Sequence, residues 1–307
     1  MSPEGYARAH LPPLLEVRDP ASLTSAAVFS SPHSGREYPD ELLAATTLSA
    51  ADLRRSEDSF VDELFAHAPD FGAPLLHARF PRAFVDVNRE PFELDPEMFA
   101  AALPGYVNGA SPRVAAGLGT IARTVSEGLE IYRGKLAFAD VLLRIQTCYE
   151  PYHQALRALV ARALEQFGHC IVIDCHSMPS GRPHGMARTR LPRLRTQPDF
   201  VLGDCHGASC DGQLVELVEA ALREIGYDVR RNVPYSGGFI TRNYGAPESH
   251  VHALQIEINR ALYMDEDKFA RLPALTRIAQ DMRAVYASVA ACSHLLGRDR
   301  SLRAAAE

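Results

Sequence analysis

The sequence predicts a single α/β domain with a mixed, mostly parallel β-sheet flanked by helices. Short apolar runs typical of strands alternate along the chain with longer amphipathic segments typical of helices. Hydrophobic residues make up 47% of the 307 residues, so the chain can bury a substantial core. We expect one domain over residues 25–295, preceded by a proline-rich lead-in (1–24) and followed by a C-terminal tail that frays (296–307).

The first strand and the first helix follow the lead-in. Residues 26–30 are mostly apolar and stop at a Pro-His-Ser-Gly turn, which marks the end of a strand. Residues 47–68 carry much of an apolar stripe at helical spacing, with Ser49 as the N-cap and Asp52 three residues later. This pattern predicts one helix over the segment.

Proline and glycine interrupt the elements that come next. Two short strands are expected at 74–78 and 83–87, on either side of Pro81. Residues 91–134 are punctuated by Gly and Pro, which predicts long loops with short helices, and loops of such length are usually functional or mobile.

The second half of the chain continues the alternation of helix and strand. A helical pattern covers residues 136–167, and Pro151 inside it should kink or divide the helix. The elements expected after it are strands at 170–174, 199–203, 227–231 and 253–259, a helix at 212–225, a Gly-Gly turn at 237–238, and closing helices.

Composition and charge exclude several classes of partner. The formal net charge is −6 and no basic run is present, so neither nucleic acid nor an anionic membrane is an expected partner. No apolar stretch approaches the ~18 residues of a membrane span. The first residues lack the features of a signal peptide, so we expect a cytoplasmic protein. The six cysteines form no C-x-x-C pair, which indicates reduced thiols, and nothing in the sequence indicates an oligomer.

Polar and ionisable side chains cluster where the expected strands end. Because ligands of a parallel α/β sheet bind beyond the carboxyl ends of its strands, groups delivered by several strands can meet at one edge. Four separate strands bring such groups, which are His33, the set Asp86, Asn88 and Arg89, the pair Asp174 and His176, and Glu257.

Two histidines and one carboxylate form the ligand set of a hydrolytic zinc site. His33 and His176 are the best-placed histidines, and Asp58 or Glu57 is the best-placed carboxylate. A nucleophilic thiol is the alternative, because Cys175 lies beside His176. Adjacent residues on a strand point to opposite faces, however, so these two would not form a nucleophile–base pair, and we favour zinc.

Glu257 lies inside an apolar strand, where an unpaired carboxylate is costly to bury. One explanation is an ion pair with a nearby cation such as Arg260, and the other is a role in catalysis. The sequence has no H-E-x-x-H, G-x-S-x-G, Walker or G-x-G-x-x-G motif that would point to a different chemistry.

Taken together, these pieces resemble the N-formylglutamate amidohydrolase family. The matching stretches occur in order over about residues 28–285, which is most of the chain. They are "SSPHSGREYP" (30–39), "SEDSFVDELF" (56–65), "FVDVNRE" (84–90), "LGTIAR" (118–123), "LLRIQTCYEPYHQAL" (142–156), "DCHSMP" (174–179), "DFVLGD" (199–204) and "NVPYSGGFITRNYGAPESHVHALQIEINRALYMDE" (232–266).

The resemblance implies a fold similar to the zinc carboxypeptidases and aminoacylases, with about one zinc ion per chain. His33 and His176 would be metal ligands, and we assign the third position to Asp58. Carboxypeptidase-like enzymes usually carry that acid shortly after the first histidine, where this chain has Arg36 and then Glu37. Glu37 and Glu57 are therefore the alternative third ligands.

The resemblance also implies roles around the metal. Glu257 corresponds to the catalytic glutamate, and Asn88 with Arg89 resembles the pair that holds a substrate's α-carboxylate. Metal-binding histidines usually need an acid that orients them, and we assign this role to Asp174 and Asp86.

The implied reaction is hydrolysis of a small anionic N-acyl amino acid, with N-formyl-L-glutamate, formate and glutamate as the expected compounds and histidine degradation as the expected pathway. A zinc deacylase or carboxypeptidase with another N-acyl substrate is the alternative, followed by a non-catalytic amino-acid binding protein.

Residues 234–245 could form a glycine-hinged flap over the pocket. The further cationic or donor candidates are Arg79, Arg82 and Arg144 for the oxyanion, and Arg182, Arg188, Arg190, Arg242 and Tyr244 for the substrate.

Overall fold

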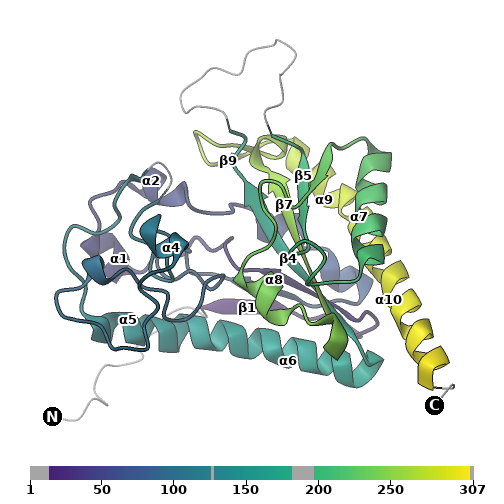
Figure 1. Cartoon of the computed structure of the whole chain (residues 1–307). Coiled ribbons are helices and arrows are strands. Elements are labelled where there is room, and N and C mark those ends of the chain that lie inside the picture. The colour runs from purple at the N-terminus through teal and green to yellow at the C-terminus, as the bar shows by residue number, and fades with distance from the viewer. Residues whose placement is uncertain (1–13, 126–127, 182–196, 305–307) are drawn as a thin grey trace.

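A seven-stranded mixed sheet forms the centre of the molecule (Figure 1). The computed structural model describes residues 14–125, 128–181 and 197–304. The strand order is β1-β3-β2-β4-β7-β5-β6, and every neighbouring pair is parallel except β1 with β3 and β5 with β7. The strands are β1 (Leu15–Arg18), β2 (Ala27–Ser31), β3 (Leu75–Ala78), β4 (Cys170–Met178), β5 (Phe200–Gly203), β6 (Val229–Arg231) and β7 (Val251–Asn259), and β8 (Met264–Asp265) pairs with β9 (Ala270–Arg271) in a separate two-stranded ladder.

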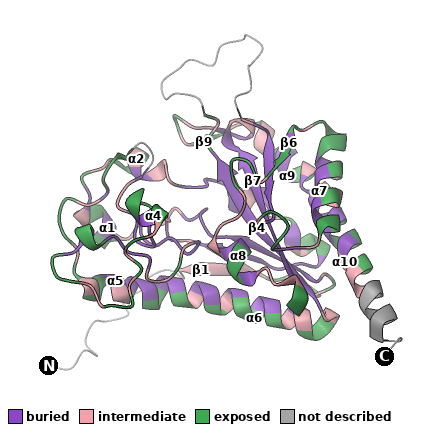
Figure 2. Ribbon diagram, in the orientation of Figure 1, coloured by how far each residue is buried: buried purple, intermediate pink, exposed green. Residues whose placement is uncertain are grey.

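Helices cover both faces of the sheet, and each face has its own buried hydrophobic cluster. In Figure 2 the central strands β4 and β7 are buried throughout, whereas the helices alternate between buried and exposed residues. One face is covered by α3 (Val61–Leu64), α7 (Gly212–Ile225), α9 (Ala274–Asp281) and α10 (Arg283–Ala304). The other face is covered by α5 (Phe138–Arg144), α6 (Glu150–Phe167) and α8 (Phe239–Tyr244), and the short helices α1 (Asp40–Ala45), α2 (Ala50–Arg54) and α4 (Pro112–Ala115) lie in the loops beside it.

The central strand β4 shows how the sheet divides its side chains. Ile171, Ile173 and Cys175 point into the cluster under α7 and α10, as the period of two requires. Asp174 and His176 alternate with them and so point to the α6 face. The structure thus confirms a core-forming strand, and it extends the strand to Met178, so that His176 lies within β4 rather than beyond its end.

Two expected elements are wrong. Residues 83–87 form turns and loop instead of a strand: the Phe84 N–H bonds to the Pro81 carbonyl, and the apolar side chains of this segment are buried without strand pairing. The single helix expected over 47–68 is broken between α2 and α3, where Phe60 adopts a left-handed backbone with φ of 68°. Apolar spacing reports burial, and here it does not distinguish a helix from a folded loop.

Other expected elements are confirmed. Helix α7 has the expected bounds, and strands β2, β3, β5, β6 and β7 lie within two residues of the expected ones. The helix expected to be divided near Pro151 changes at Ile145–Tyr149 into a π-helical turn, because proline cannot donate the next backbone hydrogen bond. The sequence did not predict β1, which pairs with β3, and α10 continues through Ala304 into the segment expected to fray.

Within the described ranges, no helix combines the length and the hydrophobicity that crossing a membrane requires.

Gly35, in the turn after β2, has no room for a side chain. A Cβ there would lie 2.0 Å from the Phe80 carbonyl oxygen, which is backbone and cannot move aside alone. We expect Gly35→Ala to lower the free energy of unfolding by about 1–3 kcal/mol, as overpacking usually does. Gly212→Ala is the matched control, since nothing lies within 4 Å of its added Cβ, and it should melt at the wild-type temperature or slightly above. Equal melting temperatures for the two variants would contradict the packing described for the turn.

Candidate active site

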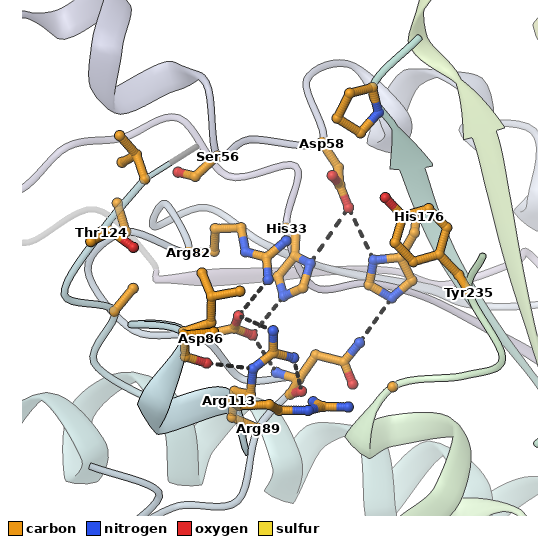
Figure 3. A pocket seen from close by; sticks show the side chains of 18 of the residues that line it. His33, Ser56, Asp58, Arg82, Asp86, Arg89, Arg113, Thr124, His176 and Tyr235 are labelled. Atoms are coloured by element: carbon orange, nitrogen blue, oxygen red, sulfur yellow. Dashed lines mark hydrogen bonds and ion pairs between the residues drawn. The ribbon is translucent and has the colours of Figure 1, made fainter. Parts of the chain in front are cut away.

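Three buried side chains meet at the carboxyl ends of the central strands: His33, Asp58 and His176. One ligand atom from each lies within 4.8 Å of the others, and the three side chains are at most 4% exposed. The Nδ1 atoms of both histidines face the same Asp58 oxygen, at 3.5 Å from His33 and 3.0 Å from His176 (Figure 3). This is the arrangement of two nitrogens and one oxygen that a zinc site uses.

The chain brings Asp58 to this point through the break between α2 and α3. His33 stands in the turn after β2, and its carbonyl accepts a hydrogen bond of 3.0 Å from the Asp58 N–H. A continuous helix over this segment would have satisfied that N–H internally. The unexpected break therefore positions the third member of the cluster.

The outer nitrogen of each histidine faces an acid. His33 Nε2 lies 2.7 Å from Asp86 Oδ1, and His176 Nε2 lies 2.9 Å from Asp174 Oδ1. Such acids fix the ring orientation and tautomer of metal-binding histidines. His33 Nδ1 is buried without a hydrogen-bond partner, and a cation at the centre of the cluster would satisfy it. The residues therefore fit a metal ion.

Charge compensation keeps the acids of the cluster ionised. Burial alone would raise the pKa of Asp58, but the hydrogen bond from His176, the neighbouring His33 and the charge of Arg260 hold it well below its usual range. Arg260 Nη2 donates to Asp58 Oδ1 at 2.9 Å. Burial likewise would raise the pKa of Asp86, and the charges of Arg82 and Arg89 hold it well below its usual range.

Glu257 lies beside His176, because the two are register partners in the parallel strands β4 and β7. Its side chain is buried and accepts a 2.9 Å hydrogen bond from Gln255 Nε2. Arg260 pairs with Asp58, so within the described residues Glu257 has no ion-pair partner, and the ion-pair explanation of its burial does not hold. Burial raises the pKa of Glu257 to about 7, against the lowering effect of a protonated His176.

A cavity of about 970 Å³ opens over the cluster. It is cationic although the whole chain is acidic, because seven arginines and four carboxylates line it among the residues that the structure describes. The lining arginines are Arg55, Arg82, Arg89, Arg113, Arg123, Arg242 and Arg260, and the lining carboxylates are Asp58, Asp86, Glu130 and Glu257.

Several residues expected at the site do lie on this cavity. They include Asn88, Arg89 and Arg242, together with Arg82 from the arginines considered for the oxyanion. Asn88 joins the site to α8, because its Oδ1 accepts a 2.7 Å hydrogen bond from the Ile240 N–H. The segment expected to form a flap contributes residues 234–238 to the cavity wall, and α8 follows directly.

The structure places other expected residues elsewhere. Arg144 is buried between Glu41 and Tyr132, and the Tyr244 hydroxyl bonds to His153 on α6. Neither lines the cavity, so the structure does not bring them to the expected site.

The two alternative third ligands are also occupied away from the cluster. Glu57 is bonded to Tyr38, Arg54 and Ser59, and Glu37 is paired with Arg79. Of the three candidate acids, Asp58 alone lies with the two histidines. The expected substrate contacts Arg182, Arg188 and Arg190 lie outside the described residues.

Cys175 takes no part in the site. Its side chain is fully buried in the cluster on the opposite face from His176, and burial raises the pKa of the thiol well above its usual value. A thiol held neutral in an apolar cluster is a poor nucleophile.

Three residues of the site were not expected from the sequence: Gln255, Arg113 and the Arg260 that compensates Asp58. A signal existed for Gln255, because it precedes Glu257 by two residues and so shares its face of β7. Arg113 belongs to the short helix α4, whose place is set by tertiary contacts, and no periodicity points to it.

Comparison with known proteins identifies the family. The profile of the family described as N-formylglutamate amidohydrolase matches residues 25–264. A protein named N-formylglutamate deformylase from Pseudomonas putida is 31% identical over 78% of this chain and 82% of its own length. The protein of the same name from Pseudomonas aeruginosa is 32% identical over 89% of this chain and 94% of its own length.

The chain belongs to the N-formylglutamate amidohydrolase family. Membership makes it one of a family of enzymes that hydrolyse linear amides. The crystal structure of the N-formylglutamate amidohydrolase from Ralstonia eutropha JMP134 has a TM-score of 0.83 to this structure at 34% identity, covering 94% of this chain and all of that one. A gene product of Agrobacterium tumefaciens shares the fold, with a TM-score of 0.64 at 18% identity over 90% of this chain and 93% of its own.

The cluster predicts which substitutions remove a bound metal. After loading with zinc and dialysis, His33→Ala and His176→Ala should lose the ion, and Asp58→Asn should hold it more weakly. Asp86→Asn should weaken binding by about 10–100-fold, the usual cost of losing an orienting acid. Elemental analysis and competition with a chelator measure both effects. Glu37→Gln is the control and should keep wild-type affinity; loss of zinc in this variant but not in Asp58→Asn would move the third ligand to Glu37.

Proposed function

We propose that this protein is a zinc-dependent N-formylglutamate deformylase, which hydrolyses N-formyl-L-glutamate to formate and L-glutamate. The observation that carries the proposal is the position of the His33, Asp58 and His176 cluster in a cavity rich in arginine, beside a buried Glu257 that has no ion pair with any described residue. The relatives named N-formylglutamate deformylase support this choice of substrate.

His33, Asp58 and His176 would hold the zinc ion through two Nδ1 atoms and one carboxylate oxygen. When bound, zinc supplies Lewis acidity and a lowered pKa for water, which none of the surrounding side chains provides. The chain's own contribution is to fix the ligands: Asp86 and Asp174 orient the histidines, and Arg260 holds Asp58.

Glu257 would act as the general base and then as the general acid. It takes a proton from the attacking water and returns that proton to the leaving amide nitrogen, which departs as an amine. A pKa near 7 suits both steps, because the group can gain and lose a proton at neutral pH. Gln255 holds one oxygen of Glu257 and leaves the other for the water.

Arg89 and Asn88 would hold the substrate's α-carboxylate. The Nε and Nη1 atoms of Arg89 donate to the carbonyls of Leu118 and Asn88, both at 2.8 Å, so the plane of the guanidinium is fixed before substrate binds. Its side chain is 11% exposed, and a charge pair formed there is stronger than one on the surface. Arg82 would share the developing oxyanion, because it lines the cavity and Asp86 holds it at 2.6 Å.

A role in histidine degradation and a cytoplasmic location stay predictions. Hydrolysis of N-formylglutamate by purified, zinc-loaded protein, compared with hydrolysis of a panel of other N-acyl amino acids, tests the choice of substrate.

Removing the general base should separate chemistry from binding. We expect Glu257→Gln to keep zinc and substrate affinity and to lower kcat by about 10²–10⁴-fold. Because the base must be deprotonated, wild-type kcat/KM should fall as the pH drops through the pKa of Glu257. The positive charge of zinc lies close by and should bring that pKa below its value of about 7 in the metal-free protein. A raised KM with kcat preserved in Glu257→Gln would reduce Glu257 to a structural role.

Arg89 should give the enzyme its selectivity for a substrate with a free α-carboxylate. Wild type should strongly prefer N-formyl-L-glutamate over its α-amide, and Arg89→Ala should treat the two almost alike. Arg89→Lys keeps the charge but loses the planar fork, so kcat/KM should still fall by about tenfold or more. The measurement is kcat/KM for both compounds. If Arg89→Ala preferred the acid as strongly as wild type does, Arg89 would not bind the α-carboxylate and would only compensate the charge of Asp86.

A further inference from the structure

Most arginines of the cavity are already neutralised or held, and two are not. Four of them form ion pairs: Arg82 and Arg260 with buried aspartates, Arg55 with Asp52, and Arg123 with Asp95. Arg89 donates to two backbone carbonyls and lies near Asp86. Within the part of the chain that the structure describes, Arg113 and Arg242 line the cavity without a carboxylate at ion-pair distance. Their charge is therefore available to a ligand.

The two arginines come from separate elements whose backbones are fixed. Arg113 belongs to α4, which is capped by Ser111 through a 3.1 Å hydrogen bond from the Val114 N–H. Arg242 belongs to α8, which Asn88 holds through the Ile240 N–H. Two rigid elements thus present one guanidinium each to the same cavity.

The two positive charges lie close enough to oppose each other. Burial lowers the pKa of Arg113, and the charge of Arg242 is the next cause of the same shift. Glu93 and Asp86 offset part of this repulsion from a distance, but neither forms an ion pair with Arg113. Like charges brought together destabilise the empty site, and an anion bound between them removes the remaining repulsion. A carboxylate is a suitable anion, because its two oxygens accept from guanidinium groups in a bidentate manner.

We propose that Arg113 and Arg242 form a second anion subsite, which holds the side-chain carboxylate of an acidic N-acyl amino acid. The inference rests on the proposed function, since it assigns the α-carboxylate to Arg89 and the scissile amide to the metal cluster and Glu257. Asn88 is next to Arg89 in the chain and also contacts α8, so the two carboxylate subsites share one wall. This arrangement selects a dicarboxylate over a monocarboxylate.

A comparison of acid and amide side chains tests the subsite. N-formyl-L-glutamate and N-formyl-L-glutamine are nearly the same size. They differ in the charge of the side-chain group that Arg113 and Arg242 would bind. We expect Arg113→Met and Arg242→Met each to lower the ratio of kcat/KM for N-formyl-L-glutamate to kcat/KM for N-formyl-L-glutamine by about tenfold or more. The ratio should fall because kcat/KM for N-formyl-L-glutamate falls. Hydrolysis of N-formyl-L-glutamine should change little, and the ratio for the acid over its α-amide should also persist, because Arg89 is intact.

Arg123→Met is the matched control. It removes a cavity-lining arginine that Asp95 already neutralises, so it should keep the wild-type ratio. The double variant Arg113→Met with Arg242→Met should lose less than the product of the two single losses, because each residue needs the other to hold one carboxylate. Melting temperatures show whether each variant is folded, and charge-retaining Arg113→Lys and Arg242→Lys variants should recover part of the preference.

The outcomes separate this inference from the proposed function. If wild type hydrolyses N-formyl-L-glutamate and both methionine variants keep its preference for the acid, the subsite is wrong and the function stands. If wild type does not hydrolyse it, the function is wrong, and binding of glutarate measured by calorimetry then tests the subsite. Glutarate should bind at least about tenfold more weakly to either methionine variant than to wild type or Arg123→Met, and equal binding would overturn the proposal.

Discussion

The structure depends on the compensation of buried charge at the carboxyl ends of β2, β4 and β7. Asp58, Asp86, Asp174 and Glu257 are all at least 93% buried within one site, and so are His33 and His176. Ionised carboxylates stay buried only when cations or hydrogen bonds offset their lost hydration. Arg260 and Arg82 supply part of that compensation, and the remaining acceptor atoms converge on the point where a metal ion fits.

Charge is arranged in two zones around this point. Asp58, Asp86 and Glu257 lie beside the two histidines, where a cation is favoured. Arginines that these acids do not neutralise line the same cavity, which favours an anionic substrate. The sheet makes this possible, because the parallel register of β4 and β7 sets His176 directly beside Glu257. The chain as a whole carries a net charge of −6, so the sign of a local site could not have been read from the total.

Local patterns in the sequence predicted the central sheet and the core of the site. Strand β4 with Asp174 and His176, strand β7 with Glu257, and the turn with His33 follow from apolar runs that stop at or contain ionisable residues. The break that carries Asp58 could not be predicted, because it depends on the bond from its N–H to the His33 carbonyl and on the left-handed Phe60. Arg144 and Tyr244 illustrate the opposite error: both are polar residues near motifs, yet Glu41 and His153 hold them away from the cavity.

The central claim is that two imidazoles and one carboxylate hold a metal ion at this site. X-ray absorption at the zinc edge of the loaded protein tests it most directly, because it reports the kind and distance of the ligands. The account predicts nitrogen and oxygen ligands at about 2.0–2.2 Å with the scattering pattern of two imidazoles. A sulfur ligand at about 2.3 Å, or a spectrum without imidazole, would contradict it.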